Sequence, residues 1–117
     1  MNRLRIYIAG PYLPKTESIH EAARLAEQNT ERAIKIGIMV MKKGHIPYIP
    51  HLSHYIHLKS DQEFSEKYWY NFDIEWLRLC DAILHFAPSK GADNELRIAR
   101  ELGLLEFHTP EEVPEHE

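Results

Sequence analysis

Residues 4–11 read LRIYIAGP, a short run of β-branched and aromatic residues that ends at a Gly-Pro pair. Such a run predicts a strand followed by a sharp exit loop. Similar short runs recur at residues 45–50 (HIPYIP), 82–87 (AILHFA) and 104–107 (LLEF). Helical patterns separate these runs, so the sequence predicts strands that alternate with helices.

The longest helical pattern begins at Ser18, which has the spacing of a capping box with Glu21, and it ends at Gly44. Its stripe of small and apolar residues at helical spacing consists of Ala22, Ala26, Asn29, Ala33, Gly37 and Val40. A second capping box at Ser60 and Glu63 predicts a helix that runs to about Cys80. Residues 51–61 before it are expected to be a polar connection, and residues 92–102 form a third predicted helix.

This alternation favours an α/β fold, a single Rossmann-like three-layer domain with a small, mainly parallel sheet of about four or five strands flanked by helices. We expect the domain to span residues 1–108 and the acidic tail, residues 109–117, to be mobile. Ligands of such sheets bind beyond the carboxyl ends of the strands. Three loops are therefore expected to line a site, and they are residues 10–16, 51–60 and 88–94.

The composition excludes several classes of protein. The chain has 117 residues and a net charge of -4, and four of its glutamates lie in the last seven residues, so the body is close to neutral. It lacks the basic stripe of a nucleic-acid binder. The single cysteine, Cys80, excludes an intrachain disulfide. We find no signal peptide and no apolar run long enough to cross a bilayer, and we therefore expect a cytoplasmic protein.

Two carboxylates are candidates for chemistry. Glu95 is predicted in the first turn of the last helix, on one face with Ile98 and Ala99, where the helix N-terminus would keep it ionised as a nucleophile. The plain alternative is that acidic residues are common in first turns. Asp73 is the only carboxylate in a stripe that includes Trp69 and Trp76, and burial beside such rings raises a carboxyl pKa. Its plain alternative is an ion pair at the edge of the core.

Other polar residues carry weaker signals. Tyr7, near the end of the first strand, is either a core tyrosine or part of a site. The spacing of His51, His54 and His57 would place them on one helical face, but no other ligand lies nearby before Asp61. We therefore prefer surface or substrate-lining histidines to a metal site, and we expect neither a metal nor a cofactor.

Together, several ordered motifs resemble the nucleoside 2-deoxyribosyltransferase-like superfamily. The matching segments are residues 6–12 (IYIAGPY), 44–50 (GHIPYIP), 73–77 (DIEWL), 80–83 (CDAI) and 89–96 (SKGADNEL), together with Ala99. The resemblance spans about residues 4–107 and implies an enzyme that acts on a nucleoside or nucleotide.

The resemblance also implies roles for individual residues. Glu95 matches the attacking glutamate, Tyr7 the tyrosine that positions it and Asp73 the acid/base aspartate, so the implied intermediate is a covalent glycosyl-Glu95. The residues implied to bind the substrate are Gly10, Pro11, Tyr12, His51, Ser89 and Gly91.

One position distinguishes the branches of this superfamily. Transferases carry an aspartate two residues before the loop glycine, where this chain has Ser89, and a serine there resembles the 2′-deoxynucleoside 5′-phosphate N-hydrolase branch. The phosphate loop of that branch is absent after the first strand. Lys15 and Thr16 could replace it, with Lys90 opposite.

The sequence therefore favours an N-glycosidase of a (deoxy)nucleoside 5′-monophosphate or nucleoside. Base exchange by a transferase, a non-catalytic nucleotide-binding module and a metal-dependent protein remain as alternatives. A small-molecule substrate is the expected ligand, and nucleic-acid polymers and membranes are not expected partners. The apolar stripes of the long first helix and of the Trp-bearing helix also predict a homodimer or a higher even oligomer.

Overall fold

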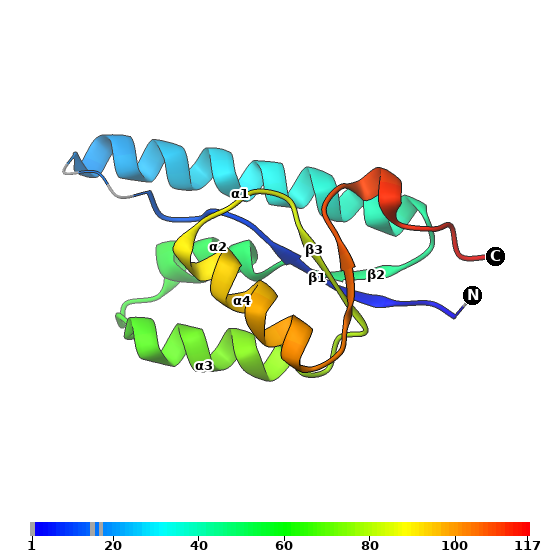
Figure 1. The fold of residues 1–117 in the computed structure, drawn as a ribbon. Coiled ribbons are helices and arrows are strands. Elements are labelled where there is room, and N and C mark those ends of the chain that lie inside the picture. Colours follow the sequence, from blue (N-terminus) through cyan, green and yellow to red (C-terminus); the bar gives the residue numbers. More distant parts are fainter. Residues whose placement is uncertain (1, 15, 17) are drawn as a thin grey trace.

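The structure is a computed structural model, and it describes residues 2–14, 16 and 18–117. Four strands form one all-parallel sheet in the order β2-β1-β3-β4 (Figure 1). They are β1 (Arg5–Ala9), β2 (Ile46–Tyr48), β3 (Ala82–His85) and β4 (Leu105–Phe107). The predicted α/β class and the parallel sheet flanked by helices are confirmed.

The helices cover both faces of the sheet (Figure 1). They are α1 (Ile19–Lys42), α2 (Ser53–Lys59), α3 (Glu66–Leu77) and α4 (Lys90–Glu101), with short 3₁₀ turns η1 (Pro50–Leu52) and η2 (Pro110–Glu112). Alternation along β1 decides which residues meet which layer: Ile6 and Ile8 pack with α1, whereas Tyr7 and Ala9 pack with α3 and α4. Tyr7 therefore faces the same layer as Asp73 and Glu95.

Helix α1 begins and ends where the sequence predicted. The Ser18 hydroxyl accepts a hydrogen bond from the Glu21 N–H at 3.2 Å, and Gly44 has the left-handed φ of 90° that favours glycine after a helix. Ala26, Ala33, Gly37 and Val40 of the predicted stripe are buried, and Ala33 and Val40 pack in the core cluster that contains Ile6 and Ile8 of β1. None of the helices in the described part of the chain is long and apolar enough to span a membrane.

The predicted boundaries were wrong around residues 51–65. The expected polar connection contains η1 and α2, and α3 begins at Glu66 behind the cap Ser65 instead of near Ser60. The Ser60 hydroxyl bonds both the N–H and the carbonyl of Gln62, which closes a local turn and leaves it unavailable as a helix cap.

The acidic tail is not the mobile segment that the sequence suggested. Val113 is 1% exposed and joins the core beneath α1. The Lys43 ammonium donates to the carbonyls of Pro110 and Val113, both at 2.7 Å, and His45 Nε2 lies 2.6 Å from the Pro114 carbonyl. The expectation was wrong because it considered only the exposed glutamates. It did not consider that Val113 packs in the core and that backbone carbonyls of the tail accept hydrogen bonds.

Candidate active site

The buried hydroxyl of Tyr7 meets the carboxylate of Glu95. Tyr7 is fully buried at the middle of β1, and its hydroxyl donates a hydrogen bond to Glu95 Oε2 on α4. Glu95 is part-buried, and burial raises its pKa to about 8, with a further rise from the charge of Asp73 and an opposing effect from the Tyr7 hydrogen bond. The desolvation of this carboxyl group therefore outweighs its one donor.

Asp73 of α3 forms a second, similar pair with Tyr48 of β2, the strand next to β1. The Tyr48 hydroxyl, at the end of β2, donates to Asp73 Oδ1 on α3 at 3.3 Å. Burial raises the pKa of Asp73 to about 7, against the opposing effect of this hydrogen bond. The predicted elevation of the Asp73 pKa is confirmed, and its cause is the expected one.

The two tyrosines are hydrogen-bond donors and not bases. Burial, followed by the charge of the adjacent carboxylate, raises the pKa of both Tyr7 and Tyr48 well above the ordinary value. Their rings lie 5.4 Å apart, centroid to centroid, because Tyr7 and Tyr48 are paired in register across β1 and β2. The result is two phenol–carboxyl pairs side by side, with electrostatic coupling between Asp73 and Glu95.

The electrostatic prediction for Glu95 was wrong. Helix α4 begins at Lys90 behind the cap Ser89, so Glu95 lies in the second turn, and the acidic residue of the first turn is Asp93. The field of a helix terminus falls off within one turn, and burial decides the ionisation of Glu95 instead. Burial therefore favours the neutral acid form of Glu95 in the free site.

Ser89 and Gly91 lie at the start of α4, beside an acidic residue. The Ser89 hydroxyl oxygen accepts from the Ala92 N–H at 3.0 Å and so already satisfies one free amide of the helix. Asp93 Oδ1 lies 2.8 Å from His85 Nε2, and Gly91 and Lys90 are exposed. A Cβ at Gly91 would meet nothing within 4 Å, so the backbone here borders open space.

The Gly10–Tyr12 loop is held by surrounding side chains. His51 is buried, and its Nε2 lies 3.2 Å from the Gly10 carbonyl and 2.9 Å from that of Pro11; carbonyls only accept, so this nitrogen carries the proton. Asn29 donates to the Tyr12 carbonyl at 2.9 Å. A Cβ at Gly10 would overlap the end of the Phe86 ring, so any other residue here would force that ring to move.

Tyr12 also takes part in a polar chain that links α2 to α1. Its hydroxyl lies 2.8 Å from His54 Nδ1, and His54 Nε2 lies 2.8 Å from Glu27 Oε2. His57 contacts the Trp69 ring, with centroids 4.9 Å apart. His51, His54 and His57 thus have separate partners, and no cluster of three or more possible metal ligands occurs among residues 2–14, 16 and 18–117.

The three proposed phosphate ligands lie in two separate segments of the chain. Lys15 lies outside the described residues, and the Thr16 hydroxyl is 3.3 Å from the Ser18 N–H, from which it accepts. The third, Lys90, is the exposed first residue of α4. The structure therefore shows Tyr7, Asp73 and Glu95 together.

The sequence matches a family described as a domain of unknown function (DUF7768) over residues 4–105. The chain belongs to this family. No curated protein matches the chain. The family description assigns no activity, so the resemblance to nucleoside 2-deoxyribosyltransferases stays a prediction that depends on the residues described above.

Sequence reasoning missed one member of this DUF7768 site, Tyr48. Its signal was the position of a second tyrosine at the exit of the second predicted strand, two residues before Pro50. In a parallel sheet that position aligns with Tyr7, but the alignment is known only once the strand register is known. The chain from Tyr12 through His54 to Glu27 was also missed, because its members come from three distant segments.

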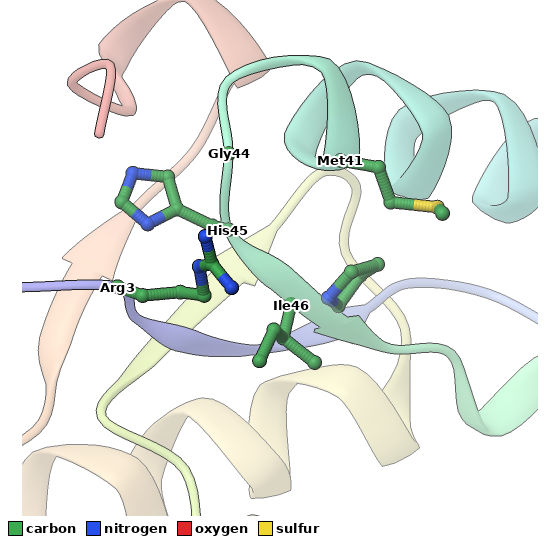
Figure 2. A pocket seen from close by; sticks show the side chains of 6 residues that line it. Arg3, Met41, Gly44, His45 and Ile46 are labelled. Atoms are coloured by element: carbon green, nitrogen blue, oxygen red, sulfur yellow. The ribbon is translucent and has the colours of Figure 1, made fainter. Parts of the chain in front are cut away.

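A separate hollow of about 300 Å³ lies at the other end of the sheet and is lined by Arg3, Met41, Gly44, His45, Ile46 and Pro47 (Figure 2). It opens at the amino end of β2, whereas ligands of parallel sheets bind beyond the carboxyl ends. Its one imidazole is committed, because His45 Nδ1 accepts from the Leu4 N–H at 3.0 Å and Nε2 contacts the Pro114 carbonyl. We therefore assign the chemistry to the Tyr7–Glu95 side.

Proposed function

We propose that this DUF7768 domain cleaves the N-glycosidic bond of a nucleoside or a nucleoside 5′-monophosphate and releases the free base. One observation carries the proposal: Glu95 is held by the buried Tyr7 hydroxyl beside a second carboxyl group, Asp73, whose pKa of about 7 suits an acid/base group. We take the enzyme to act in the cytoplasm on a small-molecule substrate.

The proposed reaction has two steps. The Glu95 carboxylate attacks the anomeric carbon while Asp73 protonates the base, and the electrons of the breaking C–N bond leave with the base. A glycosyl ester of Glu95 remains. Asp73 then removes a proton from a water molecule that attacks the same carbon, and the ester bond breaks to regenerate the Glu95 carboxylate.

The proton distribution of the free site affects the rate. The reaction needs Glu95 ionised and Asp73 protonated, and burial raises the pKa of both groups, to about 8 for Glu95 and about 7 for Asp73. The two carboxyl groups are close enough to interact, so they titrate as a pair that shares one proton over part of the pH range. The reactive form of the pair is the one in which that shared proton lies on Asp73.

Trapping the ester would test the proposal directly. A nucleoside with fluorine at sugar carbon 2 slows both steps, because fluorine destabilises the oxocarbenium-like transition state. We expect an intact-protein mass increase equal to the glycosyl group, located on the peptide that contains Glu95 and absent from Glu95→Gln. The matched control, Glu101→Gln, replaces an exposed glutamate of the same helix and should still be labelled.

A substrate panel tests the reaction itself. Incubation with nucleosides and their 5′-monophosphates, followed by chromatography, should yield free base with wild type and none with Glu95→Ala. Addition of a second free base separates hydrolysis, which leaves free sugar, from base exchange, which produces a new nucleoside. Release of base by Glu95→Ala at the wild-type rate would eliminate the mechanism. Binding of a nucleotide by the wild-type protein without turnover would identify a non-catalytic module.

A further inference from the structure

Tyr48 is held rigidly next to the proposed site. It is the last residue of β2, and its ring lies 5.4 Å from the ring of Tyr7 and 5.4 Å from that of Trp76, which stacks on it at an interplanar angle of 17°. Contacts with these two aromatic rings restrict the rotation of the phenol. Its hydroxyl is therefore fixed in direction by packing.

The fixed hydroxyl reaches a single oxygen of Asp73. It donates to Oδ1, and burial together with the Asp73 charge raises the pKa of Tyr48 so that the phenol keeps its proton. Tyr7 does the same for Oε2 of Glu95. In each carboxyl group, one oxygen receives a phenol donor and the other does not.

We propose that Tyr48 is a positioning residue that reserves Oδ2 of Asp73 for the transferred proton, as Tyr7 reserves Oε1 of Glu95 for attack on the sugar. This inference rests on the proposed function. The phenol hydrogen occupies Oδ1, so the acid proton of Asp73 resides on the oxygen without that donor. The direction in which Asp73 delivers its proton is thereby set by a residue that touches no reacting atom.

The ionisation of Asp73 provides a readout that a purely structural role would not change. The charged and titratable groups facing Asp73 are Tyr48 on β2, Tyr7 on β1 and Glu95 on α4. The Tyr48 hydrogen bond lowers the pKa of Asp73, since a donor stabilises the ionised carboxylate. Without this donor, Asp73 should titrate at higher pH.

Tyr48→Phe keeps the stacked ring and removes only the donor. Relative to wild type, we expect the Asp73 side-chain carbon signal in ¹³C NMR to titrate about 0.5–1 pH unit higher. We also expect the kcat/KM profile to move to higher pH. At the new pH optimum, kcat should fall about tenfold or more with a smaller change in KM, because the proton of Asp73 is no longer confined to Oδ2. Tyr68→Phe removes an exposed hydroxyl from the helix that carries Asp73 and serves as the control.

The outcomes separate this inference from the proposed function. An active wild type, with a Tyr48→Phe variant that matches Tyr68→Phe in both the Asp73 titration and the pH profile, overturns the role of Tyr48. A folded wild type that releases no base from the panel overturns the proposed function. In that case, a higher titration pH of Asp73 in Tyr48→Phe still supports Tyr48 as the group that orients this carboxyl group. An unchanged titration pH overturns the role of Tyr48 as well.

Discussion

Replacing Glu95 by glutamine should make the protein more stable, by an amount that grows with pH. The buried carboxyl has its pKa raised from 4.5 to about 8, so the folded protein binds the proton more tightly than the unfolded chain does. Stability is therefore lost as pH rises from about 4.5 to about 8, and the loss is complete above that range. Glutamine has nearly the same shape, keeps an oxygen that can accept from Tyr7 and carries no charge.

The magnitude follows from the same values. A change from 4.5 to about 8 corresponds to about 5 kcal/mol, because a tenfold change in an equilibrium is about 1.4 kcal/mol. That figure is an upper limit, because Glu95 is only part-buried and solvent screening reduces the cost to about half. We expect the variant to gain about 2–5 kcal/mol over wild type at pH 9, and almost nothing at pH 4.5.

Urea unfolding followed by circular dichroism, from pH 4.5 to pH 9, measures the difference between the two proteins. Glu101→Gln controls for the loss of a carboxylate from the exposed face of α4. A difference in unfolding free energy that rises between pH 5 and pH 8 and then becomes constant supports the reasoning. Parallel stability curves for wild type and Glu95→Gln would show that the carboxyl is solvated, and the assignment of Glu95 to a desolvated site would be wrong.

Other measurements test the remaining parts of the structure. The kcat/KM profile should be a narrow bell with limbs at about 7 and about 8, and a plateau from pH 5 to pH 9 would contradict the coupled carboxyl pair. Gly10→Ala should lower the urea midpoint because its Cβ would lie 2.0 Å from Phe86, whereas Gly91→Ala, with nothing within 4 Å, should gain up to about 1 kcal/mol. A higher KM in Gly91→Ala would show that substrate approaches that backbone. Deletion of residues 109–117 should cost about 2–4 kcal/mol through loss of buried Val113, and an unchanged midpoint would mean that the tail does not pack. Light scattering at micromolar concentration should give at least twice 13.8 kDa, and a monomer mass would contradict the predicted oligomer.

The fold was predictable because its signals are local. The short run that contains Tyr7, the cap at Ser18 and the stop at Gly44 each act within a few residues, and all three agree with the structure. The errors arose where two local signals competed. Ser60 and Ser65 both offer a hydroxyl for a helix start, and only the three-dimensional structure shows that the first one bonds Gln62 and the second caps α3.

The site was only partly predictable, for a different reason. Helical spacing placed Asp73 and Glu95 on inward faces, and the structure confirms that both are part-buried. Their ionisation depends on the residues packed around them. For this reason desolvation, and not the helix terminus, decides the direction in which the pKa of Glu95 changes. Tyr48 required the strand register, a non-local property that no single-sequence pattern reports.

The two tyrosines suggest why such a costly pair of carboxyl groups can persist in so small a core. A buried carboxyl without a donor would be driven toward the neutral acid, and a fully solvated one would be ionised but a poor proton donor near pH 7. With one phenol donor each, Asp73 has a pKa of about 7 and Glu95 has a pKa of about 8. Both values lie between the pKa of a solvated carboxyl group and that of a buried one without a donor. Since the phenols come from adjacent strands in register, the rigidity of the sheet sets the spacing of the two carboxyl groups. Substitutions that alter the pairing of β1 with β2 should therefore disturb both titrations together, even when neither tyrosine is changed.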